Sequence, residues 1–141
     1  MAQYGVVVGC LSIDSVRAAA RRMKGMLPKT PLRYSAARGV WLKLENVQET
    51  GSFKVRGALN ALLAQAERGL DGPVIAASAG NHGAGVAWAA RRLGLKAQIV
   101  VPQDAPRTKV TCIRRLGATV IHCGANFDES LVHAKALARR H

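Results

Sequence analysis

The sequence predicts an α/β fold built on an open parallel sheet with flanking helices. Three short apolar segments, residues 74–77, 97–101 and 118–121, are each followed by a longer segment with helical periodicity. Strands that are apolar on both faces need cover on both sides, and their alternation with helices is typical of parallel strands joined by right-handed crossovers. With 141 residues, 49% hydrophobic and 21% charged, the chain can form one domain with a core.

The helices expected after these strands cover residues 83–93, 106–116 and 127–140. Pro106 suits the first turn of a helix, where no backbone donor is needed. Asn126 and Glu129 have the spacing of a capping box at the start of the last helix.

The N-terminal part of the chain is expected to be less regular. A helix over residues 12–27 would be capped by Ser12 or Asp14 and ended by Pro28. An extended connector at residues 30–32, a short strand at 40–44 and a polar loop at 45–51 follow. A second helix is expected over residues 52–68, and its apolar stripe consists of Leu59, Leu62, Leu63, Ala66 and Leu70.

Charge is the unusual feature of the composition, with 21 basic against 8 acidic residues and a formal net charge of +13. Such a balance is typical of nucleic-acid-binding proteins. Here, however, the basic residues are spread from Arg17 to Arg140, and several doublets fall late in expected helices, where they complement the helix dipole. Aromatic residues do not interleave with them as a base-stacking surface requires. We expect neither a nucleic-acid partner nor a membrane span, and keep nucleic-acid binding as a distant alternative.

The cysteines Cys10, Cys112 and Cys123 form no paired motif. An odd count with wide spacing favours reduced thiols and a cytoplasmic protein. Together with His122 and His133 they match no zinc-ligand spacing, so we expect no metal site.

Two segments with unusual residues fall at strand-to-helix turns, the edge at which open parallel sheets bind ligands. In the first, residues 49–57, Lys54 is expected in the first turn of a helix. The positive end of the helix dipole disfavours a cation there and favours the neutral amine that Schiff-base chemistry requires. Gly51 and Gly57 permit close backbone approach and Phe53 offers a flat apolar face. Without these neighbours, an ordinary surface lysine would be the better interpretation.

The second segment, residues 78–83, leaves a strand and enters a helix through small residues. Their backbone N–H groups would point at one spot, which suits a carboxylate or a phosphate. Asn81 adds a neutral donor and acceptor, whereas His82 at a helix start is more often a hydrogen-bonded structural residue than a base. The segment is neither a P-loop nor a dinucleotide-binding fingerprint.

Taken together, Leu44-Glu45, residues 50–58 (Thr-Gly-Ser-Phe-Lys-Val-Arg-Gly-Ala) and residues 77–82 (Ala-Ser-Ala-Gly-Asn-His) strongly resemble the pyridoxal-phosphate-dependent serine/threonine dehydratase family of fold-type II. The likeness covers nearly the whole chain and continues through residues 99–102, 109–110 and 124–129. Within the family it is greatest to threonine dehydratases (threonine ammonia-lyases). The resemblance implies a tryptophan-synthase-β-like fold with the cofactor between two α/β domains.

The resemblance also implies the site and the reaction. Pyridoxal 5'-phosphate would be bound to Lys54 as a Schiff base, with Phe53 packed beside its ring and Asn81 hydrogen-bonded to its phenolic oxygen. Lys54, freed by the substrate amine, would remove the α-proton. The products would be ammonia and 2-oxobutanoate from L-threonine, as in isoleucine biosynthesis, or ammonia and pyruvate from L-serine. The substrate carboxylate would be received by Ser78, Ala79, Gly80, Asn81 and His82.

One position helps to choose among members of the family. Serine racemases of this family carry a serine where this chain has Ala79 and use its hydroxyl on the opposite face of the substrate. Alanine cannot carry a proton. We therefore expect elimination to exceed racemisation.

The resemblance places residues 1–51 in an N-terminal segment of the large domain and residues 52–141 in the small α/β domain. The family's glycine-rich phosphate loop lies further along, so we expect the remainder of the large domain to be absent and this chain alone to be poorly soluble and inactive or weak in cofactor binding. A homo-oligomer is expected when the protein is complete. Two alternatives remain: a sibling eliminase acting on serine or hydroxyaspartate, and a non-catalytic truncated binding module.

Overall fold

The computed structural model describes residues 12–140, and a three-stranded parallel sheet lies at its centre. The strands are β3 (Val74–Ala77), β4 (Ala97–Val101) and β5 (Thr119–His122), in that order across the sheet. β4 is the middle strand, and its residues Ile99 and Val100 are 0% exposed because helices cover both faces. The predicted α/β class with a parallel sheet is confirmed.

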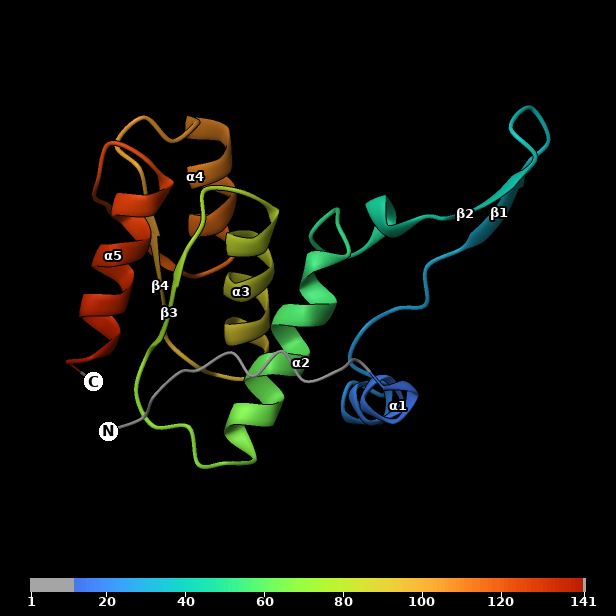
Figure 1. The fold of residues 1–141 in the computed structure, drawn as a ribbon, viewed down its shortest axis with the longest axis horizontal. Helices are drawn as coiled ribbons and strands as arrows, with labels where there is room; N and C mark the ends of the chain where they lie inside the picture. The colour runs from blue at the N-terminus through green and yellow to red at the C-terminus, as the bar shows by residue number, and fades with distance from the viewer. Residues whose placement is uncertain (1–11, 141) are drawn as a thin grey trace.

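Helices form layers on either side of this sheet (Figure 1). α3 (Asn81–Arg92) and α4 (Arg107–Arg115) follow successive strands and pack on one face, whereas α5 (Phe127–Ala138) packs on the other against β3 and β4. α2 (Lys54–Ala66) lies on the outer side of α3, and α1 (Ile13–Arg22) contacts α2. The helix that begins at Lys54 therefore packs mainly against α3.

The ends of the helices follow local chemistry. Ser12 caps α1 by accepting a hydrogen bond of 3.1 Å from the Ser15 backbone N–H. Asn126 caps α5 by accepting one of 3.0 Å from the Glu129 N–H, as its spacing predicted. Basic doublets lie in the last turns of three helices, as predicted: Arg21 and Arg22, Arg91 and Arg92, Arg114 and Arg115.

The first helix is shorter than the sequence predicted. α1 ends at Arg22 instead of residue 27. Gly25 follows with a φ of +76°, a left-handed conformation that reverses the chain before Pro28 is reached. The stop signal was therefore the glycine and not the proline.

An antiparallel ribbon precedes α2. It pairs β1 (Leu32–Ser35) with β2 (Val40–Lys43), and a short 3-10 helix, η1 (Glu45–Val47), follows. The sequence predicted a strand near β2 but only a connector at residues 30–32, so β1 was missed. Its sequence, Leu-Arg-Tyr-Ser, mixes polar and apolar residues and none of them is buried, which weakens the strand signal.

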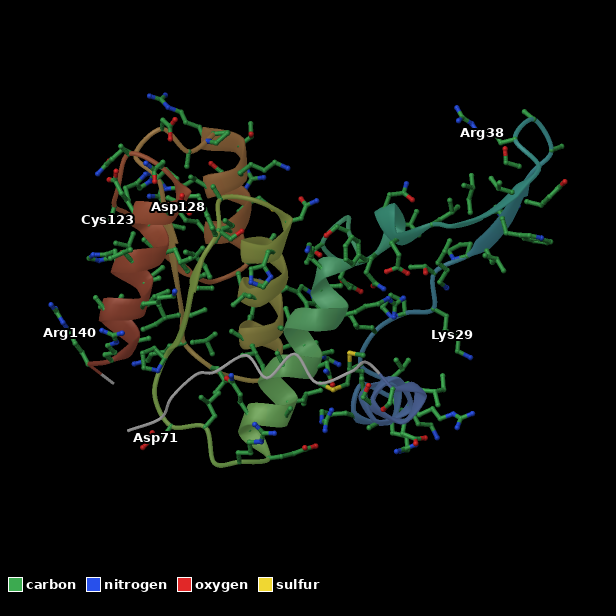
Figure 2. All side chains as sticks on the ribbon, in the orientation of Figure 1. Lys29, Arg38, Asp71, Cys123, Asp128 and Arg140 are labelled. Atoms are coloured by element: carbon green, nitrogen blue, oxygen red, sulfur yellow. The ribbon has the colours of Figure 1, made fainter. Side chains whose placement is uncertain are left out.

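The ribbon extends away from the helices and the sheet, with Arg38 at its tip (Figures 1 and 2). Its Tyr34 and Trp41 rings lie 5.4 Å apart between centroids, and Trp41 is 65% exposed. Exposed apolar side chains at this density are typical of surfaces that another segment covers. The assignment of residues 1–51 and 52–141 to two domains stays a prediction.

The described residues hold two cysteines, of which Cys112 is exposed and Cys123 is half-buried, and neither forms a disulfide. Cys10 lies outside the described residues. Between residues 12 and 140 no group of histidine, cysteine and acidic side chains could hold a metal ion. In the same range no helix is long and apolar enough to cross a membrane.

Gly83 in α3 has no room for a side chain. A Cβ there would lie 2.5 Å from the Ser78 carbonyl oxygen and 3.1 Å from the Ile113 side chain. We expect Gly83→Ala to lower the free energy of unfolding by about 2–3 kcal/mol, measured by urea denaturation. The matched control is Gly57→Ala, because a Cβ at Gly57 in α2 meets nothing within 4 Å. That variant should be neutral or more stable by up to about 1 kcal/mol, and equal losses in both variants would contradict the packing argument.

Candidate active site

Lys54 is the first residue of α2, so it lies in the first helical turn as predicted, although the helix begins two residues later than the predicted start at residue 52. The backbone N–H of Lys54 donates a hydrogen bond of 3.4 Å to the Ser52 hydroxyl. The side chain of Lys54 is exposed. The Lys54 Nζ lies 5.1 Å from the centroid of the Phe53 ring, which is 60% exposed. An amine and a flat aromatic face are thus presented together at one helix end.

A close helix–helix contact brings Lys54 to the second predicted segment. A Cβ on Gly85 of α3 would lie 3.1 Å from the Lys54 carbonyl carbon and from the Val55 nitrogen. The first turn of α2 therefore rests directly on the first turns of α3. Because β3 leads through residues 78–80 into α3, the lysine and the predicted carboxylate loop share one end of the structure.

The loop itself is organised around Ser78. Its hydroxyl oxygen accepts hydrogen bonds from the Gly83 N–H at 3.0 Å and from the Gly80 N–H at 3.3 Å. This arrangement acts as an N-cap and starts α3 at Asn81, two residues before the predicted start at residue 83. Asn81 and His82 thus belong to the first helical turn and not to the preceding loop.

Capping by Ser78 leaves other donors open. Within residues 12–140, the backbone N–H groups of Ala79, Asn81 and His82 have no hydrogen-bond acceptor. N–H groups at a helix start carry the positive end of the helix dipole. They form a site for an anionic group such as a carboxylate.

The His82 imidazole, in the first turn of α3, is within electrostatic reach of Lys54. Loss of hydration lowers the pKa of His82, and the positive charge of Lys54 lowers it further. His82 is therefore neutral at pH 7, so it can accept a hydrogen bond as well as donate one.

A cavity of about 230 Å³ lies beside Asn81 and Gly80. Thr50 lines it, and the Thr50 Oγ1 is buried without a hydrogen-bond partner among the described residues. A buried hydroxyl of this kind needs a partner from a ligand or from water. Residues of α4 complete the wall: Thr108, Lys109 and Cys112.

These additional residues were not predicted as site residues. Thr50 and Lys109 belonged to the segments that carried the resemblance, and Lys109 follows the carboxyl end of β4, where ligands of parallel sheets bind. Of the predicted residues, Gly80 and Asn81 line this cavity. The other predicted residues do not line it and lie at or just before the starts of α2 and α3: Phe53, Lys54, Ser78, Ala79 and His82. A larger hollow of about 540 Å³ between α4 and β5 contains none of them.

An ion pair joins Arg56, two residues after Lys54 in α2, to Glu45 in η1. The Arg56 Nε donates to the Glu45 Oε2 at 2.8 Å, and the Arg56 Nη2 donates to the Glu45 Oε1 at 2.9 Å. Hydrogen bonds from Arg56 and then from Thr30 lower the pKa of Glu45 to about 2, and the same bond raises the pKa of Arg56. Both partners keep their charges across the physiological range.

The fold and the site together define the class of protein. A model of the family described as "Pyridoxal-phosphate dependent enzyme" matches residues 24–141, and the chain belongs to this family. The predicted fold-type II relationship and the pyridoxal phosphate cofactor are confirmed.

Individual relatives point to a narrower group. Over 126 residues the chain is 43% identical to the L-threonine ammonia-lyase of Thermotoga maritima, covering 85% of this chain and 31% of the relative. It is 40% identical over 136 residues to the catabolic L-threonine dehydratase of Staphylococcus aureus, covering 92% and 39%. The chain thus spans less than half the length of these relatives.

Solved structures agree on the fold and include more than one activity. The processed form of threonine deaminase isoform 2 from Solanum lycopersicum superposes with a TM-score of 0.79 and 33% identity, over 92% of this chain and 41% of that one. Maize serine racemase superposes with a TM-score of 0.87 and 31% identity, over 94% and 42%. The comparisons therefore establish the family, whereas the particular reaction is a matter for proposal.

The Glu45 carboxylate makes stability depend on pH. Its pKa in the folded protein, about 2, is below the value of 4.5 expected without its partners. The stabilisation is complete above about pH 4.5 and is lost as the pH falls toward 2. With the pair partly exposed to solvent, we expect Glu45→Gln to cost about 1–2 kcal/mol at pH 7 and much less at pH 3. Urea unfolding of both proteins at several pH values tests this, and an unchanged difference at pH 3 would contradict it.

Proposed function

We propose that this chain carries the reactive lysine and the substrate-carboxylate loop of a pyridoxal-phosphate-dependent ammonia-lyase that acts on L-threonine or L-serine. The observation that supports the proposal is the contact of Gly85 in α3 with the backbone of the first turn of α2, which holds the helix start that carries Lys54 against the helix whose Asn81 and His82 N–H groups are open. The names of the relatives from Thermotoga maritima and Staphylococcus aureus support threonine as a substrate.

The residues present fit the cofactor. The Lys54 amine is exposed at a helix start, the Phe53 ring lies beside it, and the buried Thr50 hydroxyl lacks a partner among the described residues. In our proposal Lys54 holds pyridoxal phosphate covalently, Phe53 packs on the ring and Asn81 bonds the phenolic oxygen. When bound, the cofactor supplies a conjugated ring that accepts the electrons left when the α-proton departs.

The remaining tasks fall to groups of this chain. The N–H groups of the loop bind and orient the substrate carboxylate, with Ser78 and Gly80 shaping the loop. The Lys54 amine accepts the proton from the substrate α-carbon. The neutral His82 next to it adds a hydrogen-bonding group without a second positive charge.

The net reaction converts L-threonine to 2-oxobutanoate and ammonia. Loss of the β-hydroxyl as water is balanced by the water that releases ammonia. L-Serine would give pyruvate and ammonia in the same way. Hydroxyaspartate is a third substrate to compare with threonine and serine. For the complete protein we expect a cytoplasmic homo-oligomer.

Lys54 should be the lysine that captures the cofactor. Incubation with pyridoxal phosphate, reduction with borohydride and peptide mass spectrometry should locate the adduct on Lys54, and Lys54→Arg should lose it. Lys96→Arg is the matched control, because Lys96 is an exposed lysine just before β4 and outside the site. Equal labelling of Lys54 and Lys96 in the unmodified protein would overturn the assignment.

The substrate class is tested by the release of 2-oxo acid and ammonia. In a preparation that also supplies the expected remainder of the large domain, we expect threonine to be consumed faster than serine or hydroxyaspartate. Lys54→Arg should lower the rate of turnover there by at least about a thousandfold. Preferential turnover of serine or hydroxyaspartate would instead identify a sibling eliminase. Adduct formation without any turnover, in a preparation containing the rest of the large domain, would identify a non-catalytic binding module.

Ala79 should limit racemisation. It is half-buried beside Ser78 and offers no group that can donate or accept a proton. With L-serine we expect pyruvate to exceed D-serine, and Ala79→Ser to raise the ratio of D-serine to pyruvate by about tenfold or more. Ala79→Gly, which adds no hydroxyl, is the control and should leave the ratio unchanged. Comparable amounts of D-serine and pyruvate from the unmodified protein would refute the prediction.

A further inference from the structure

Glu45 joins three segments that are distant in the chain. Besides its two bonds with Arg56 of α2, it accepts a hydrogen bond of 2.5 Å from the Thr30 hydroxyl, which lies ahead of β1. The Lys43 ammonium, at the end of β2, donates to the Thr30 carbonyl oxygen at 2.6 Å. Thr30 is only 6% exposed, so this network is shielded from water on one side. A partly buried, bidentate pair of this kind has a fixed geometry that a single surface contact lacks.

The pair closes a loop that contains Lys54. The chain leaves Glu45, passes through η1 and Phe53, and returns to the same carboxylate at Arg56, two residues beyond Lys54. The N-cap residue of α2, Phe53, makes no side-chain capping bond. The start of α2 is therefore held by the Glu45–Arg56 pair as well as by the backbone contact with Gly85 and the burial of Val55.

We propose that Glu45 and Arg56 are positioning residues that set the direction and reactivity of the Lys54 amine. The inference rests on the proposed function of Lys54 and deepens it. With the pair intact, the first turn of α2 has one orientation against α3. With the pair broken, the loop that contains Phe53 and Lys54 loses the anchor at Arg56, and the amine samples a wider range of positions.

A second ion pair on the same helix provides a matched control. The Arg22 Nε donates to the Glu67 Oε1 at 3.0 Å, and the Arg22 Nη1 donates to the Asn60 Oδ1 at 2.7 Å. These bonds tie α1 to the middle and the end of α2 and leave its start untouched. Arg22→Gln thus loosens the same helix at a distance from Lys54.

The experiment compares Glu45→Gln, Arg56→Gln, the double variant and Arg22→Gln in the full chain. The first readout is hydrogen exchange over residues 50–56. The second is the rate at which acetic anhydride acetylates Lys54 relative to Lys96 in the folded protein, which needs no cofactor. The third is borohydride trapping of pyridoxal phosphate at Lys54. The first two readouts separate this proposal from the proposed function, which the third tests in the unmodified protein.

We expect both single variants to speed exchange over residues 50–56 and to change the acetylation ratio of Lys54 to Lys96 by about threefold or more. The double variant should change the exchange rate and the acetylation ratio no more than either single variant does, since the two residues act through one contact. Arg56→Lys keeps the positive charge but cannot form both hydrogen bonds to the Glu45 carboxylate. It should therefore restore the exchange rate and the acetylation ratio only partly, compared with Arg56→Gln. Arg22→Gln should leave both readouts at their original values.

Two results would overturn the proposal. The first is an unchanged acetylation ratio in Glu45→Gln and Arg56→Gln despite lower stability, because the pair would then be structural only. The second is an equal change in Arg22→Gln, because any loosening of α2 would then suffice. Failure of the unmodified protein to trap pyridoxal phosphate at Lys54 would refute the proposed function instead, and the acetylation and exchange readouts would still decide the role of the pair.

Discussion

The site depends on the contact between Gly85 of α3 and the backbone of the first turn of α2. A Cβ at Gly85 would lie 3.1 Å from the Lys54 carbonyl carbon, so a side chain there would require the two helices to move apart by a few tenths of an ångström. The same packing buries Val55 and Leu59 completely. The position of the lysine and the stability of this helix layer are therefore linked, because one interface provides both.

A second close approach explains how donors remain open at the start of α3. The Ser78 hydroxyl satisfies the N–H groups of Gly80 and Gly83, and the missing side chain of Gly83 makes room for the Ser78 carbonyl oxygen. The first turn of the helix is thus capped by Ser78, and the N–H groups of Asn81 and His82 have no acceptor within residues 12–140. A conventional capping side chain at position 80 would occupy one of these N–H groups and compete with a carboxylate ligand.

The parts of the fold with strong local signals were predictable from the sequence. β3 and β4 have the predicted bounds because their residues are apolar on both faces, and α2 begins in the predicted motif. β1 was missed because its side chains are not buried, so its sequence carries no burial pattern. The early start of α3 depends on a hydrogen bond from Gly83 to Ser78, five residues apart, which matches no usual capping pattern. The pairing of Glu45 with Arg56 and the cavity at Thr50 and Lys109 are tertiary contacts, and periodicity contains no information about them.

Lys54 lies at the junction of two differently supported parts of the molecule. On one side are α3 and the sheet, with a core in which Ile99 and Ile113 are almost fully buried. On the other side is the exposed ribbon, whose β2 ends two residues before Glu45 and is tied to Thr30 through Lys43. Since Thr30, Glu45 and Arg56 form one continuous set of hydrogen bonds, a shift of the ribbon acts on the start of α2. The apolar side chains of the ribbon are exposed in this chain, which spans less than half the length of its relatives. In our proposal, a contact that displaces the ribbon would therefore act, through Glu45, on the orientation of the lysine.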